Sequence, residues 1–134
     1  MNHCLVFGAR GHLAQTRIIP ALEKIPCPYT PISRKQVSNL KHLENVPDVV
    51  AYMAIPTHNF QENVTPYLGM IDPLYILEKP HGHSFQDFES IQSFIRENNL
   101  KVLYADHYLG KSVLDRIETP DNLDSIKVVL HESA

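Results

Sequence analysis

The stretch HCLVFGARGHLA, residues 3–14, decides the fold that we expect. An apolar run over residues 3–7 leads directly into the spacing G-x-x-G-x-x-A, and apolar residues then recur at helical intervals over residues 13–25. A dinucleotide site needs this order, because the glycines permit a tight turn close to a pyrophosphate and the small third residue lets the helix pack on the strand. The helix N-terminus would add positive potential. The same spacing is also compatible with an ordinary glycine turn between a strand and a helix.

Strand-like and helix-like segments alternate along the rest of the chain. We expect further strands at residues 29–33, 48–54, 74–77, 101–105 and 125–130, and further helices at residues 36–44, 57–70, 84–98 and 111–117. This alternation predicts a Rossmann-like α/β fold, with a mostly parallel sheet and helices on both faces. The fold should be shortened, because residues 35–47 leave little room for an additional strand and helix. We expect one dinucleotide-binding domain over residues 1–134.

Two of the expected helices begin with capping signals. Thr57 and Ser84 each stand where an N-cap residue would start a helix, and Asp87 lies three residues after the second of them. The helix after Ser84 carries an apolar face that we expect to lie in the core, formed by Phe85, Phe88, Ile91 and Ile95.

The composition excludes several classes of protein. The chain has 134 residues, 43% of them hydrophobic and 20% charged, which is typical of a globular domain. A net charge of −3 argues against nucleic acid or an acidic membrane surface as a partner. The sequence has no apolar stretch of about 18 residues, and its two cysteines suit a reducing, cytoplasmic setting. His81 and His83 lack a third ligand at a supporting spacing, so we expect no metal.

The end of the second expected strand bears on cofactor choice. An NAD site usually places an acidic residue about 20 positions after the glycines to hold the ribose diol. Here residues 32–35 read ISRK, and Arg34 beside the Ser33 hydroxyl suits a 2′-phosphate. These residues favour NADP over NAD, although a solvated basic turn would have the same composition.

A second candidate site, ILEKPHG, spans residues 76–82. It places Glu78 and Lys79 at the carboxyl end of a strand, where open α/β sheets bind their ligands. Lys79 would reach towards both a nicotinamide and a substrate. The alternative is that Glu78 and Lys79 form a surface pair before a proline turn.

A third candidate site, DHYLGK, follows the expected strand at residues 101–105. Lys111 and His107 could both donate to a phosphate, Tyr108 adds a hydroxyl, and Asp106 could orient a histidine base. Residues 105–112 also differ by one residue from the phosphate loop G-x-x-x-x-G-K-[ST] of nucleoside triphosphatases. Alanine replaces the first glycine there, and the following aspartate would repel the phosphates.

These motifs together resemble the N-terminal part of glucose-6-phosphate dehydrogenases. Residues 106–111 are identical to that family's DHYLGK signature, and four further segments resemble its motifs in the same order: VFGARGHLAQTRIIPAL at 6–22, YMAIP at 52–56, LEKPHG at 77–82 and KVVLHE at 127–132. His12 departs from the pattern, because the family has Asp in its G-x-x-G-D-L-A turn.

The resemblance implies an NADP-dependent oxidoreductase of glucose metabolism, in which hydride passes from C1 of a sugar phosphate to NADP to give the lactone. It implies that the cofactor is bound by Gly8, Ala9, Arg10, Gly11, His12, Leu13, Ser33, Arg34 and Lys79. It further implies that glucose 6-phosphate is held by Lys79, His107, Tyr108, Lys111 and Glu132. Asp106 would orient the base.

The family's catalytic histidine lies in its larger domain, downstream of the strand that ends at Glu132 in this chain. We therefore keep two hypotheses: a dehydrogenase that is truncated or completed by a partner chain, and a non-catalytic module that binds NADP or a sugar phosphate. Residues 124–134 would begin the missing substrate domain. The unpaired edge of their strand favours a homodimer or a partner chain.

Overall fold

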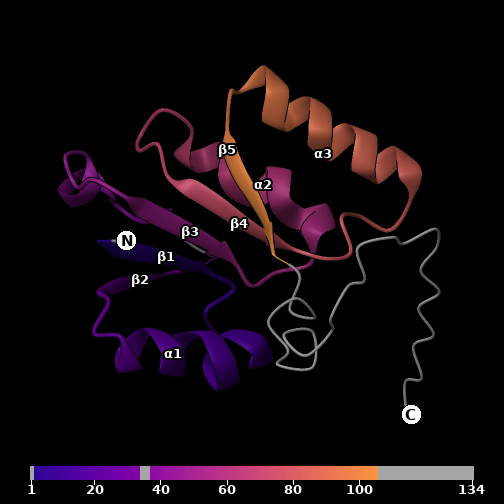
Figure 1. Cartoon of the computed structure of the whole chain (residues 1–134). Coiled ribbons are helices and arrows are strands. Elements are labelled where there is room, and N and C mark those ends of the chain that lie inside the picture. Colours follow the sequence, from indigo (N-terminus) through magenta and orange to yellow (C-terminus); the bar gives the residue numbers. More distant parts are fainter. Residues whose placement is uncertain (1, 34–36, 106–134) are drawn as a thin grey trace, which may run out of the picture.

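A computed structural model describes residues 2–33 and 37–105, which form one parallel sheet covered by helices (Figure 1). The five strands lie in the order β2-β1-β3-β4-β5, and every neighbouring pair is parallel. They are β1 (His3–Phe7), β2 (Tyr29–Ile32), β3 (Val49–Met53), β4 (Leu74–Glu78) and β5 (Lys101–Ala105). The Rossmann-like α/β fold is confirmed, and each expected strand up to residue 105 is present. The strand expected at residues 125–130 and the helix expected at 111–117 lie outside the described residues.

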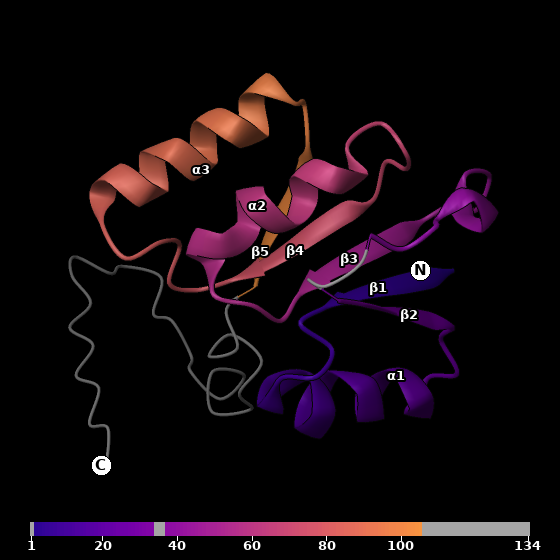
Figure 2. The same cartoon turned by 180° about the vertical axis from the view of Figure 1, so that it is seen from behind.

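The helices cover opposite faces of the two halves of the sheet. α1 (Ile19–Lys24) packs on β1 and β2, whereas α2 (Phe60–Val64) and α3 (Phe85–Glu97) cover the other face (Figure 1 and Figure 2). The chain moves one way along the sheet from β1 to β2 and the other way from β3 to β5. Since crossovers between parallel strands are right-handed, this reversal places the helices on different faces.

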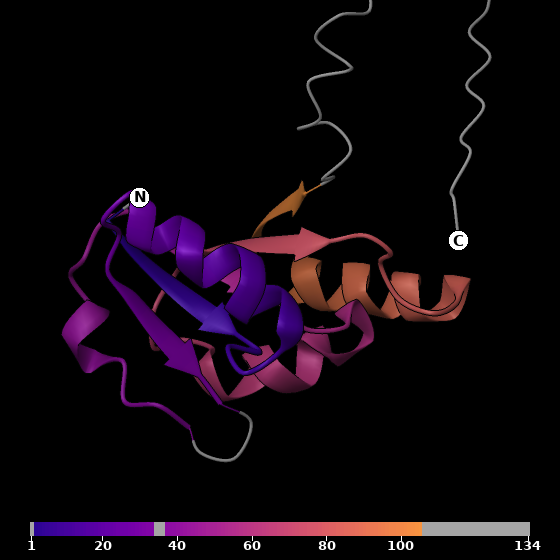
Figure 3. The same ribbon diagram turned by 90° about the horizontal axis from the view of Figure 1, so that it is seen from below.

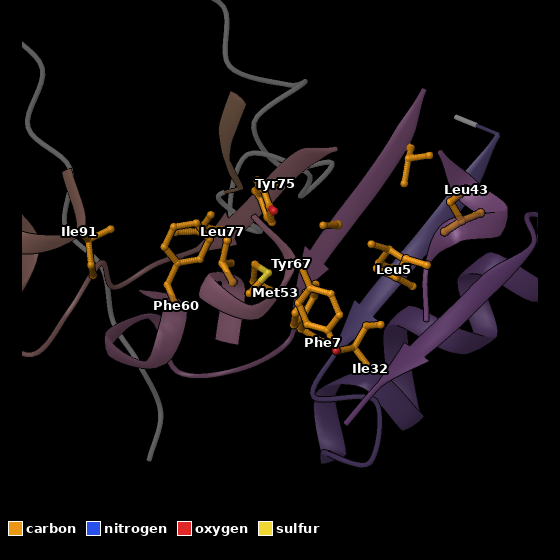
Figure 4. Close-up of a cluster of buried hydrophobic side chains, with 14 residues drawn as sticks. Leu5, Phe7, Ile32, Leu43, Met53, Phe60, Tyr67, Tyr75, Leu77 and Ile91 are labelled. Atoms are coloured by element: carbon orange, nitrogen blue, oxygen red, sulfur yellow. The ribbon is translucent and has the colours of Figure 1, made fainter. Parts of the chain in front are cut away.

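Side chains that alternate along β1 build two apolar clusters. Cys4 and Val6 face α1, and Leu5 and Phe7 face the larger cluster beneath α2 and α3. Figure 4 shows that larger cluster, in which the fully buried Phe60 ring forms a T-shaped pair with the Tyr75 ring at a centroid distance of 5.6 Å. The core is thus continuous from β2 to α3.

A π-helical turn lets the first helix contain a proline. The helix begins near Leu13 as expected, but residues Ala14–Ile18 form a π-helix, η1, before α1 starts. The amide of Ile19 donates to the carbonyl of Ala14, five residues back. Pro20 lacks an amide hydrogen and would clash in a regular helix, so the wider turn accommodates it.

Two other expected helices differ from the structure. Residues 37–44 contain only a short 3-10 turn, η2 (Lys41–Leu43), because the Asn39 side chain accepts from the Lys41 amide at 3.1 Å and the Ser38 amide donates to the Tyr67 hydroxyl. The expected helix at 57–70 is divided into η3 (Thr57–Asn59), α2 and η4 (Thr65–Tyr67). Thr57 is not its N-cap: Pro56 occupies that position, without a side-chain capping bond.

The helix α3 confirms one expectation and corrects another. The Ser84 hydroxyl caps it by accepting from the Asp87 amide at 3.1 Å, as expected. Ile91 is buried, but Phe85 and Phe88 are 72% and 38% exposed, so their assignment to the core was wrong. Figure 3 shows the physical reason, because the N-terminal half of α3 extends past the end of β4, where there is no sheet beneath it. No helix in the described part of the chain is long and apolar enough to cross a bilayer.

Candidate functional site

The candidate site lies where the order of the strands reverses. β1 and β3 are neighbours in the sheet, but the chain leaves β1 towards β2 and leaves β3 towards β4. The loop after β1 therefore diverges from the loops after β3 and β4 at the same edge, beyond the carboxyl ends of the strands. Open α/β sheets bind their ligands at such a switch point.

The glycine turn after β1 lies tightly against the end of β3. The Gly11 amide donates to the Gly8 carbonyl at 2.8 Å, which closes the turn. Gly8 has φ +72°, and a Cβ atom there would lie 2.4 Å from the Ala54 carbonyl oxygen and 2.6 Å from Ile55 Cγ2. Only glycine permits both this conformation and this approach. Ala14, the small third residue of the spacing, is fully buried against the sheet.

Two cavities adjoin along the loop after β3. One has a volume of about 320 Å³ and the other about 340 Å³. Both are lined by Ala54, Ile55 and Pro56, so this short segment separates them. Cavities of this size are at the lower end of those that hold small ligands, and together they run across the switch point.

The first cavity, which we call the turn cavity, gathers residues predicted to bind the cofactor. It is lined by Gly8, Ala9, Arg10, Gly11 and Ser33, together with Ile32 and the shared segment. Its lining offers turn backbone, a guanidinium group and a hydroxyl beside the apolar Ile32 and Ile55. This composition fits the adenosine and phosphate half of a dinucleotide.

The second cavity, which we call the lysine cavity, lies between the loops after β3 and β4. Its lining includes Leu13 and Lys79, which the sequence had proposed as cofactor contacts, and also Thr57, His58 and His83. The wall is apolar in part, and Glu78 adds a carboxylate beside the Lys79 ammonium and the two imidazole rings. Such a lining could receive an aromatic ring next to a polar substrate.

The other residues proposed from the sequence are not in these cavities or lie outside the described residues. His12 is exposed and lines neither cavity. Arg34 lies outside the described residues, as do Asp106, His107, Tyr108, Lys111 and Glu132. Their roles stay predictions.

The loop after β4 is held by contacts that the sequence did not reveal. The Thr57 side chain, 8% exposed, donates to the Pro80 carbonyl and accepts from the Gly82 amide at 2.7 Å. The peptide bond between Lys79 and Pro80 is cis. Since Thr57 and Gly82 are 25 residues apart, no local pattern could have shown this contact.

Histidines surround the same loop. The rings of His58 and His83 lie 4.1 Å apart at the lysine cavity, and His81 stacks on Tyr104 at 4.2 Å. Burial, and then the neighbouring Lys79 ammonium, lower the pKa of His81. No sequence motif singles out His58, and only the tertiary contact with His83 brings it to the cavity. In the described part of the chain, no group of three or more His, Cys, Asp or Glu could hold a metal ion.

Comparisons with known proteins identify the fold. No protein-family model matches the chain, and no curated protein sequence matches it significantly. Among solved structures, a glucose-6-phosphate dehydrogenase in complex with glucose 6-phosphate matches with a TM-score of 0.61, 15% identity, and coverage of 85% of this chain and 38% of that one. A glucose-6-phosphate 1-dehydrogenase from Mycobacterium avium matches with a TM-score of 0.60, 16% identity, and coverage of 81% and 36%.

A third match comes from a different oxidoreductase. A 3-ketoreductase variant from Actinomadura kijaniata, in complex with TDP-benzene and NADP, matches with a TM-score of 0.56, 21% identity, and coverage of 85% of this chain and 40% of that one. The chain thus spans about two fifths of the length of these proteins. At such low identity the matches show the fold. The chain is similar to the Rossmann-like part of oxidoreductases, glucose-6-phosphate dehydrogenases among them.

Proposed function

We propose that the chain binds NADP across the switch point and forms the nucleotide-binding part of a sugar-phosphate dehydrogenase. One observation carries this proposal. The Gly8 turn is pressed against the end of β3, and two cavities of suitable lining adjoin there. A turn that needed only to connect a strand to a helix would not require so close an approach.

Each half of the cofactor has its own set of residues in this proposal. Residues 8–11 hold the pyrophosphate, and Arg34 with Ser33 holds the 2′-phosphate. Leu13 and Lys79 hold the nicotinamide end in the lysine cavity. NADP, when bound there, supplies the hydride acceptor, and Lys79 orients both the ring and the substrate beside it.

The substrate in this proposal is a phosphorylated sugar, such as glucose 6-phosphate. The support is the DHYLGK sequence, which follows β5 directly in the chain. β5 runs parallel to β4 and therefore ends at the same edge of the sheet as the lysine cavity. His107, Tyr108 and Lys111 would hold the phosphate, Glu132 a sugar hydroxyl, and Asp106 would orient the base. Phosphate binding favours the charged form of His107, so that residue is a poor proton acceptor.

A titration tests the cofactor proposal. We expect the chain to bind NADP more tightly than NAD, and Arg34→Ala to remove that preference while NAD binding stays as it was. The physical reason is the loss of a guanidinium that donates to the 2′-phosphate. An unchanged preference in Arg34→Ala would contradict the assignment of Arg34, and no binding of either nucleotide would contradict the proposed function.

A second candidate function is a non-catalytic NADP or sugar-phosphate binding module. This function requires only the turn cavity and the lysine cavity, both of which are lined by described residues. Formation of NADPH with glucose 6-phosphate separates the two candidates. Turnover would exclude the binding module, whereas NADP binding without turnover, in the presence of substrate, would support it.

A further inference from the structure

We propose that Thr57 is a positioning residue that holds Lys79 and the loop after β4 at the nicotinamide end of the cleft. This inference rests on the proposed function. Thr57 belongs neither to the glycine turn nor to the motifs that carry the resemblance to a known family.

Both hydrogen bonds of the Thr57 hydroxyl go to the loop after β4. The hydroxyl donates to the Pro80 carbonyl and accepts from the Gly82 amide at 2.7 Å. Thr57 is 8% exposed, and within the described part of the chain no other polar or charged residue is buried. A buried hydroxyl with two partners on one loop ties that loop to its own position, at the end of β3.

The far side of the same loop is held by the cap of α3. The His83 amide donates to Asp87 Oδ2 at 3.0 Å, and the Asp87 amide donates to the Ser84 hydroxyl. Gly82 has φ +90°, and a Cβ atom there would lie 2.7 Å from Asp87 Cβ, so the loop also approaches α3 closely. The segment is therefore fixed at two points, by Thr57 towards β3 and by Asp87 towards α3.

Lys79 stands directly before the segment that these contacts hold. It lines the lysine cavity together with Thr57, Pro80 and Gly82. Its backbone enters the loop through Pro80, whose carbonyl accepts from Thr57. Removal of the hydroxyl should therefore shift Lys79 relative to a ring bound in this cavity.

The turn cavity provides an internal reference. Its lining does not include Thr57 or any residue of the loop after β4. A ligand that occupies only the turn cavity should therefore be insensitive to the hydroxyl. A general loss of structure would weaken both halves of the site, whereas a positioning role affects one half.

The experiment compares Thr57→Val, Thr57→Ser and the control Thr65→Val. Thr65 bears a hydroxyl that donates to the Gln61 carbonyl at 2.7 Å within its own helical segment, so this control removes a threonine hydroxyl without reaching the loop. Dissociation constants are measured for NADPH and for 2′,5′-ADP, which carries only the adenine half. Should Thr57→Val fail to fold, Thr57→Ala makes the same deletion without the bulk.

We expect Thr57→Val to raise the dissociation constant of NADPH about tenfold relative to that of 2′,5′-ADP, since one hydrogen bond's loss is worth about this factor. Thr57→Ser and Thr65→Val should keep the wild-type ratio. The Gly82 amide should exchange faster with solvent in Thr57→Val than in the wild type.

Three results would overturn the inference. Equal weakening of both ligands in Thr57→Val would show a structural role only. If Thr57→Val binds both ligands as the wild type does, whatever the exchange of the Gly82 amide, the inference fails and the proposed function stands. If the wild-type chain binds neither ligand, the proposed function fails and the inference fails with it.

Discussion

The Tyr52 hydroxyl, on β3, donates a hydrogen bond to the carboxylate of Glu78, the last residue of β4. Tyr52 pairs with Ile76 in the sheet, so Glu78 lies two residues further along and on the same face. The bond holds Glu78, which precedes Lys79 and lines the lysine cavity with it. Desolvation, and then this hydrogen bond, raise the pKa of Tyr52 above its ordinary value of 10.0.

We expect Tyr52→Phe to lower the free energy of unfolding by about 1–2 kcal/mol, because a half-buried carboxylate loses its donor. Urea denaturation at neutral pH measures this. Glu78→Gln keeps an acceptor for the hydroxyl and should cost less. A Tyr52→Phe variant as stable as the wild type would show that the bond to Glu78 adds nothing to the fold.

A pair of glycine substitutions tests the close approach of the turn to β3. Gly8 and Gly69 have similar positive φ values, +72° and +78°, but a Cβ atom at Gly69 would meet nothing within 4 Å. Gly69→Ala should cost about 1 kcal/mol of backbone strain, and Gly8→Ala should cost this and several kcal/mol more for the clash with Ala54. Thermal and urea unfolding measure the difference. Similar losses in both variants would contradict the packing of the turn on β3.

The partly buried ring of His81 should make stability depend on pH. Its pKa is lowered in the folded chain, so between the ordinary value of 6.5 and the folded value the unfolded chain binds more protons. The stabilisation is present above pH 6.5 and is lost as the pH falls below it. His81→Phe keeps a ring against Tyr104 and should lose less stability between pH 7.5 and pH 5 than the wild type, as followed by urea unfolding. Since burial and the nearby His42 also lower the pKa of His3, some dependence should persist.

The cap of α3 offers a further test. Ser84→Ala removes the acceptor of the Asp87 amide and should destabilise the chain by about 1 kcal/mol. Ser84→Asp, which retains a capping oxygen, should restore most of that loss. Equal stability of Ser84→Ala and the wild type in urea would show that the cap is dispensable.

The sequence-based predictions were correct where they depended on local interactions and failed where they depended on long-range ones. The turn at Gly8, the individual strand segments and the Ser84 cap depend on residues within a few positions of each other, and the structure bears them out. Phe85 and Phe88 failed as core residues because their burial depends on how far the sheet extends beneath α3. Periodicity carries no information about that extent.

The candidate site shows the same division. Gly8 to Gly11 and Lys79 could be chosen from the sequence because glycine spacing and a lysine at a strand end have a local chemical meaning. His58 and Thr57 could not, because their relevance arises from contacts with the loop after β4, 25 residues along the chain.

The sequence by itself determined the order of the strands along the chain and the glycine turn, for which local propensities suffice. The strand order in the sheet, with the reversal that creates the switch point, came from the tertiary structure. Only the tertiary structure decided that Thr57 holds the loop after β4, that Tyr52 holds Glu78, and that two cavities adjoin at residues 54–56. The physical reason is that hydrogen bonds and cavities between loops depend on where separate strands end in space, and that position is set by the packing of the whole sheet.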